Sequence, residues 1–150
     1  MSKVNKLGNQ VPPTESDFVI DVEGNITKKR YIGEFTSKIL NKKDQAMVAK
    51  HRAYLNGDMV SNLDPLILRF HMKISYLRYA LVGYPKWWKE LDLGYEIYDG
   101  NVVDEVYERV LDAEETWLKT IWGEEMVEEL KKEDQDDDAG EAGPGYVKQD

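Results

Sequence analysis

Apolar and polar residues alternate in the first structured stretch of the chain. In residues 17–23 every second side chain is apolar, with three on one side of an extended strand: Phe18, Ile20 and Val22. The pair Gly24-Asn25 follows, and residues 26–35 make a second extended run. Because glycine and asparagine tolerate the positive φ of a tight turn, this pattern predicts a β-hairpin. A hairpin is marginal alone, so we expect it to pack on helices or to pair with another chain.

Two helices are predicted by their capping residues. Asn41 can cap a helix over residues 42–56, with Asp44 as a weaker form of the capping box. Asp64-Pro65 can start a second helix, because proline at the first helical position loses no needed donor. The apolar residues of this second helix form one stripe that runs towards Gly83, made of Ile67, Phe70, Ile74, Leu77 and Leu81.

The second half of the chain predicts a short helical segment and one long helix. The segment over residues 86–91 lies between Pro85 and Gly94. The long helix is predicted from apolar residues that recur every three or four positions: Val103, Val106, Val110, Ala113, Trp117 and Ile121. Together the elements predict an α+β domain over residues 17–131 that is mostly helical, with an N-terminal β-hairpin followed by three or four helices.

Charge distinguishes the end of the chain from its body. The net charge is −9, and residues 124–150 alone hold 11 acidic and 3 basic residues. We expect residues 1–16 to be a flexible arm and residues 132–150 to be a disordered acidic tail, since neither can bury much apolar surface. A nucleic-acid partner is not expected, because such proteins usually carry the opposite charge.

Composition excludes several further classes of site. The chain has no cysteine, which excludes disulfides, thiolate catalysis and cysteine-bound zinc, and fits a reducing cytoplasm. No apolar run reaches the roughly 20 residues that a membrane span needs, so we expect no membrane association. Residues 1–10 lack the apolar run of a signal peptide.

No set of residues indicates catalysis. His51 and His71 fall on different predicted helices, and neither has a metal-ligand companion four residues away. The sequence has no glycine-rich phosphate loop and no Gly-x-Ser-x-Gly elbow, and the pair Glu114-Glu115 lies in an acidic surface stretch. We therefore expect a non-enzymatic protein without metal or cofactor, whose work is contact with another protein.

The adjacent tryptophans at 87–88 are the sharpest local feature. Neighbouring helical residues point about 100° apart. Either one ring packs while the other anchors an interface, or both rings cover the core from a short helix. With one tyrosine and the apolar helix faces they make the candidate partner-binding residues, which are Tyr84, Trp87, Trp88, Phe70, Ile74, Leu77, Trp117 and Ile121.

The charges of the body are uneven. Residues 1–56 hold 10 basic and 6 acidic residues, and residues 57–123 hold 7 basic and 12 acidic residues. Scattered surface charge, a phosphate-binding patch and a head-to-tail contact between copies are three interpretations of this pattern, and the last would make the protein a homo-oligomer. The candidate self-assembly residues are Lys28, Lys29, Arg30, Lys42 and Lys43.

The order of these elements resembles the tail assembly chaperones of long-tailed bacteriophages. The likeness lies in the strand and Gly/Asn turn of residues 18–26, the second strand at 31–35 and the helix start at 39–46. The stretch 52–57, the Pro-Lys-Trp-Trp run at 85–88 and residues 101–107 also look like small phage morphogenesis proteins.

The resemblance implies a non-enzymatic chaperone. Such a protein binds and solubilises the tape measure protein and helps to recruit tail tube proteins, in the cytoplasm of the infected bacterial host. Two other functions remain open. One is a virion structural component, such as a head–tail adaptor or a tube-associated ring subunit. The other is a phage-encoded inhibitor of a host protein, with the acidic tail as a nucleic-acid mimic.

Overall fold

A computed structural model describes residues 13–123, 128–129 and 132 of the chain. Contacts divide the chain into two units, and each is described by itself. One unit is residues 13–113, and the other holds residues 1–12 and 114–150. All of the packing described below lies within residues 13–113.

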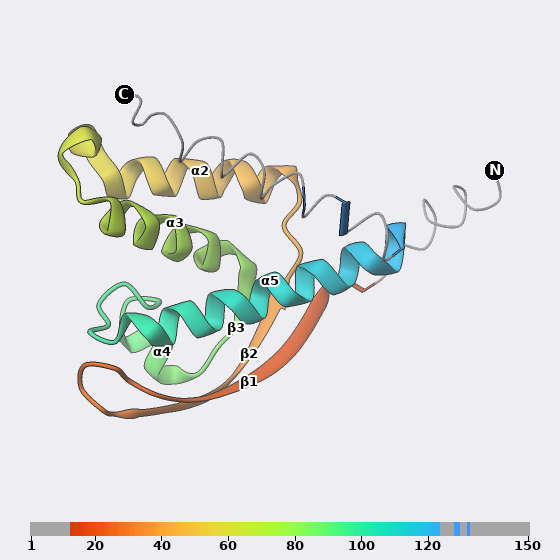
Figure 1. Ribbon diagram of the computed structural model, residues 1–150, viewed down its shortest axis with the longest axis horizontal. Helices are drawn as coiled ribbons and strands as arrows, with labels where there is room; N and C mark the ends of the chain where they lie inside the picture. The colour runs from red at the N-terminus through yellow and green to blue at the C-terminus, as the bar shows by residue number, and fades with distance from the viewer. Residues whose placement is uncertain (1–12, 124–127, 130–131, 133–150) are drawn as a thin grey trace. The chain divides into compact units, whose positions relative to one another are not determined.

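The predicted α+β class is confirmed (Figure 1). The chain forms β1 (Glu15–Glu23), β2 (Arg30–Lys38), α2 (Lys42–Asn56), a 3-10 helix (Gly57–Asn62), α3 (Pro65–Ala80), β3 (Leu81–Gly83), α4 (Lys86–Glu90) and α5 (Gly100–Trp122). β1 begins inside the predicted arm of residues 1–16. Apart from Lys132, the predicted tail of residues 132–150 lies outside the described residues.

The sheet has a third strand that the sequence analysis did not predict. β2 lies between β1 and β3, and both pairings are antiparallel. The apolar stripe predicted a helix that includes Leu81, but α3 ends at Ala80 and Leu81 pairs with Ser37 of β2. That boundary was wrong because Leu81 buries its side chain at the sheet, where it is 5% exposed.

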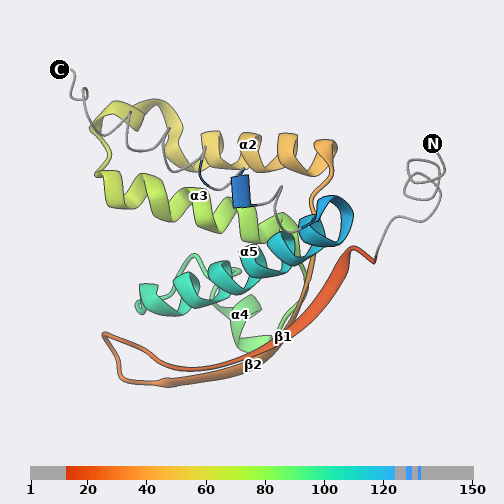
Figure 2. The same cartoon turned by 45° about the vertical axis from the view of Figure 1, so that its right-hand side comes forward.

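One face of the sheet forms the core with the helices. The buried apolar residues are Phe18, Ile20, Tyr31, Phe35, Leu40, Ile74, Leu77, Ala80, Leu81, Trp88, Val102, Val103, Val106 and Val110. Within residues 13–113, α4 and the start of α5 lie over this face, α3 lies beyond them and α2 is outermost (Figures 1 and 2). No described element of this unit covers the opposite face of the sheet.

The two predicted helix caps are confirmed. The Asn41 side chain accepts from the Asp44 backbone N–H at 2.8 Å, and the Asp44 carboxylate accepts from the Asn41 backbone N–H at 3.1 Å. Asp64 accepts from the Leu66 backbone N–H at 2.7 Å, with Pro65 in the first turn of α3. These local bonds satisfy N–H groups that have no partner inside the helix.

The hairpin turn closes around Asp99, the residue before α5. Its buried carboxylate accepts from the backbone N–H groups of Ile26 (2.7 Å) and Thr27 (2.8 Å), and from the hydroxyls of Thr27 (2.6 Å) and Tyr31 (2.7 Å). Burial alone would raise the pKa of Asp99, but these donors outweigh it and hold that pKa well below its ordinary value. Since these bonds go to the hairpin turn and to Tyr31 of β2, Asp99 fixes the hairpin to the start of α5.

Two neighbours complete this attachment of the turn. A Cβ at Gly24 would collide with the Asp99 carboxyl group, so only glycine lets the turn come this close. The Asn101 side chain accepts from the Asn25 backbone N–H at 3.0 Å and donates to the Glu23 carbonyl at 2.9 Å. The turn lies at the predicted place but is longer than predicted, because β2 starts at Arg30 and not at residue 26. Its positive φ falls at Lys28 (65°) and not at Gly24 or Asn25. Residues far along the chain hold it in place.

Candidate functional site

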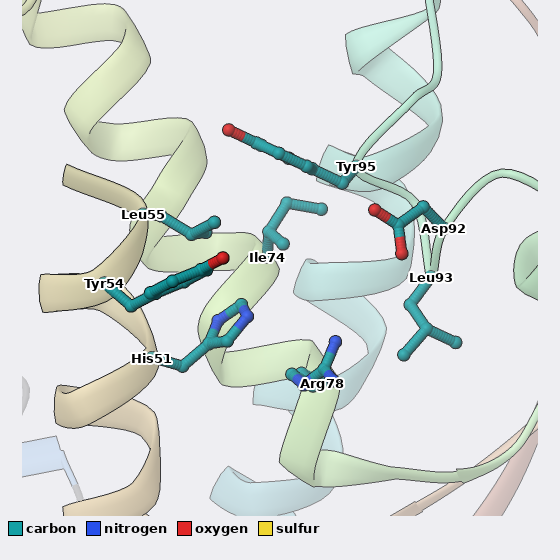
Figure 3. A pocket seen from close by; sticks show the side chains of 8 residues that line it. All are labelled: His51, Tyr54, Leu55, Ile74, Arg78, Asp92, Leu93 and Tyr95. Carbon is teal, nitrogen blue, oxygen red and sulfur yellow. The ribbon is translucent and has the colours of Figure 1, made fainter. Parts of the chain in front are cut away.

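A pocket of about 330 Å³ opens between α2, α3 and the loop that follows α4 (Figure 3). This volume is at the lower end of the range for small-ligand or side-chain sites. The lining residues are His51, Tyr54 and Leu55 from α2, Ile74 and Arg78 from α3, and Asp92, Leu93 and Tyr95 from the loop.

The pocket is lined by polar and aromatic side chains, with a smaller apolar part from Leu55, Ile74 and Leu93. Ile74 belongs to the buried core, and Leu55 and Leu93 pack against that core. Tyr54 is 79% exposed, and its ring lies 6.3 Å from that of His51. Such a site can take an apolar or aromatic side chain while the rim contacts polar atoms.

The loop wall of the pocket has an unusual backbone. Asp92, Leu93 and Gly94 have φ values of 55°, 54° and 91° in succession. A non-glycine residue in this left-handed region costs about 1–2 kcal/mol. The ring of Trp88 lies beneath, since a Cβ on Gly94 would be 2.7 Å from its Cη2 atom. The buried tryptophan therefore determines where this wall runs.

Tyr95 is held in the pocket rim by two residues of α3. Its hydroxyl is hydrogen-bonded to Nε2 of His71 at 3.0 Å, and Nδ1 of His71 is bonded to the Asn56 side chain at 2.7 Å. Its ring stacks on Phe70, with the centroids 6.2 Å apart. The rim is thus preorganised by a network that joins α2, α3 and the loop.

The surroundings of His51 favour its uncharged form. Burial, with the positive charge of Arg78 added, lowers the pKa of His51. Its Nδ1 is hydrogen-bonded to the buried Ser75 hydroxyl at 2.9 Å. Within the described residues, Arg78 and Asp92 make no hydrogen bond or ion pair with other side chains, so both charged groups remain available to a bound molecule (Figure 3).

The structure brings together only some of the predicted partner-binding residues. Ile74 lines the pocket but is only 3% exposed, Phe70 is half-buried and stacks on the rim residue Tyr95, and Tyr84 follows β3 and is 37% exposed. Leu77 and Trp88 are buried core residues, so in this fold they offer no surface to a partner. Trp117 and Ile121 are half-buried on the last turns of α5, in the second unit.

Both adjacent tryptophans cover the core, which is one of the two arrangements that the sequence left open. Trp88 is 1% exposed and lies edge-on to Phe35 at 5.5 Å. Trp87 is half-buried, packs edge-on to Tyr31 at 5.1 Å, and donates from Nε1 to the Ile32 carbonyl at 2.9 Å. An anchoring role for Trp87 in an interface stays a prediction.

The candidate self-assembly residues do not form one patch. Lys28, Lys29 and Arg30 lie at the hairpin turn, whereas Lys42 and Lys43 start α2 beyond the far end of β2 (Figure 1). Arg30 is already paired with Asp21 at 2.6 Å. The two groups therefore belong to different surfaces.

Three residues that line the pocket were not predicted from the sequence. Arg78, Asp92 and Tyr95 come from α3 and a loop, and no spacing rule links them. A signal for the loop was present in the run from Leu91 to Gly94, because aspartate and glycine tolerate positive φ.

Comparisons with protein families, curated proteins and solved structures gave no match. Among the described residues, no helix is long and apolar enough to cross a membrane. Within the same residues, no three histidine, aspartate or glutamate side chains gather as metal ligands would.

Proposed function

We propose that this protein is a non-enzymatic, protein-binding assembly chaperone of a long-tailed bacteriophage, which binds the tape measure protein. The observation that carries the binding role is the open pocket between α2, α3 and the loop, whose lining combines charged, aromatic and a few apolar side chains. The phage assignment is supported by the sequence resemblance described above.

The surface next to the pocket extends its apolar character. Leu66 and Ile67, in the first turn of α3, are 67% and 43% exposed. Ile67, Phe70 and Ile74 share one face of α3, because their spacing is that of a helix stripe. An apolar helix of a partner can place one side chain in the pocket and contact the exposed Ile67 with another.

Site-specific crosslinking tests this role directly. A photoreactive residue is placed at Tyr54 on the rim or at the exposed Glu108 of α5 as a control, and the full chain is co-expressed with the tape measure protein. A crosslink from position 54 but not from position 108 supports the proposal. Equal crosslinking, or none, rejects the pocket as the binding site.

Affinity measurements on matched variants give a second test. Arg78→Ala removes a rim contact, and the exposed Arg69 on the same helix provides the control Arg69→Ala. We expect the dissociation constant to rise about tenfold for the first and to stay unchanged for the second. The protein should also be absent from purified virions by mass spectrometry, whereas its presence there would favour a virion structural component.

A further inference from the structure

The uncovered face of the sheet is acidic around an apolar centre. Val19 of β1 and Ile32 of β2 are 55% and 58% exposed on this face. They are diagonal neighbours, because Val19 pairs with Glu34 and Ile32 pairs with Asp21. Strand alternation places five acidic residues around them: Glu15, Asp17, Asp21, Glu23 and Glu34.

The basic residues of this face neutralise it only in part. Alternation places Arg30 and Lys38 there, and each already has a partner. Arg30 contacts Asp21 at 2.6 Å, and Lys38 contacts Asp44 of α2 at 3.3 Å. The face therefore keeps a net negative charge beside exposed apolar side chains. A basic surface docked on it would neutralise this charge and cover these side chains.

The outward side of α2 is such a surface. No residue of α2 is buried, so one full side of this helix faces away from the unit. Lys42, Lys43 and Lys50 are exposed within about 100° of each other around this helix, and none of them makes an ion pair within the described residues. A helix with this much unpaired positive charge is suited to a flat acidic partner.

The two surfaces lie at opposite sides of residues 13–113. In both views the sheet is the lowest layer and α2 is the outermost helix at the other side (Figures 1 and 2). A copy can therefore present its sheet to one neighbour and its α2 to another at the same time. A contact between two different surfaces repeats from copy to copy, and builds a ring or a filament.

We propose that copies of this chain associate head to tail, with the basic side of α2 from one copy docked on the acidic sheet face of the next. The lysines of α2 neutralise the carboxylates around Val19 and Ile32, and the two apolar side chains are covered. A single helix on a three-stranded sheet makes a small interface, so the contact is weak and reversible. The contact strengthens when salt is low, because its charges are near the surface.

Reciprocal charge reversal on the full chain tests this arrangement. The sheet variant is Glu15→Lys with Glu34→Lys, and the helix variant is Lys43→Glu with Lys50→Glu. Each variant alone sets like charges against each other, so we expect its dissociation constant for self-association to rise about tenfold or more by sedimentation velocity. A mixture of the two variants has complementary surfaces at both contacts, so association should return.

Control variants carry the same charge changes elsewhere. Glu108→Lys with Asp112→Lys on α5 matches the sheet variant, and Arg69→Glu with Lys89→Glu matches the helix variant. Both should associate like the wild type, and circular dichroism should show that all variants are folded. Wild-type association should also weaken between about 50 and about 500 mM salt.

Three results would overturn the proposal. The first is a wild type that stays monomeric at submillimolar concentration and low salt. The second is a pair of variants that both associate like the wild type. The third is loss of association in both variants without recovery in their mixture, which would mean that another segment, such as the acidic residues 133–150, binds α2.

Discussion

Trp88 and Gly94 together set the loop wall of the pocket, and a double-mutant cycle can measure their contact. A Cβ at Gly94 would lie 2.7, 2.8 and 3.1 Å from three ring atoms of Trp88 (Cη2, Cζ2 and Cζ3), all on its benzo ring. Gly94 also has a φ of 91°. Gly94→Ala therefore adds a steric clash to a conformational cost, and Trp88→Phe removes the atoms that cause the clash.

Gly94→Ala should lower the free energy of unfolding through both the backbone conformation and the steric clash. A left-handed alanine costs about 1–2 kcal/mol, and overpacking a core costs about 1–3 kcal/mol. Gly94→Ala should then lower the free energy of unfolding by about 2–5 kcal/mol in the wild type. In the Trp88→Phe background only the conformational cost of about 1–2 kcal/mol should remain, which leaves a coupling energy of about 1–3 kcal/mol.

Urea unfolding followed by far-ultraviolet circular dichroism gives the four free energies, and this signal does not depend on tryptophan fluorescence. Gly123→Ala provides a control, because Gly123 has a φ of 94° but no atom of the described residues lies within 4 Å of an added Cβ. Its cost should be the same with and without Trp88→Phe. If Gly94→Ala costs equally much in both backgrounds, Trp88 does not support the loop and the reasoning is refuted.

Three further predictions concern the buried polar groups. Asp99→Asn should destabilise the fold, because an amide replaces an acceptor bonded to four donors. Since the pKa of Asp99 is lowered in the folded protein, its carboxylate stabilises the wild type above the unfolded pKa of about 3.9, and this stabilisation fades as pH falls below that value. A difference in stability between wild type and variant that stays constant down to about pH 2 would contradict this. Gly24→Ala should cost about 1–3 kcal/mol in thermal or urea unfolding, because the new Cβ meets the Asp99 carboxyl group, and an unchanged midpoint would disprove the close approach. Burial lowers the pKa of both His51 and His71, so NMR titration should find each pKa below 6.5. The free energy of unfolding should fall as pH drops below 6.5, because the unfolded chain then binds protons that the folded chain does not. A raised pKa for either histidine would count against this packing.

Features that depend on near neighbours could be predicted from the sequence. The Asn41 cap and the Asp64-Pro65 start of α3 each involve residues within a few positions of each other. Alternation in residues 17–23 also identified the inner face of β1, with Phe18 and Ile20 buried. These predictions held because backbone geometry and capping bonds are set locally.

The tertiary structure decided what those elements do to each other. Leu81 lies in β3 and not in α3 because it can pair with the edge of β2. Asp99 can be buried because the hairpin supplies hydrogen-bond donors to its carboxylate. The pocket arose where α2, α3 and a strained loop over Trp88 meet. Such features depend on contacts between residues far apart in the chain. These contacts form, and stabilise the fold, only once the core has formed. The sequence thus determined the elements and their amphipathic faces, and only packing decided which faces were covered and which were left open.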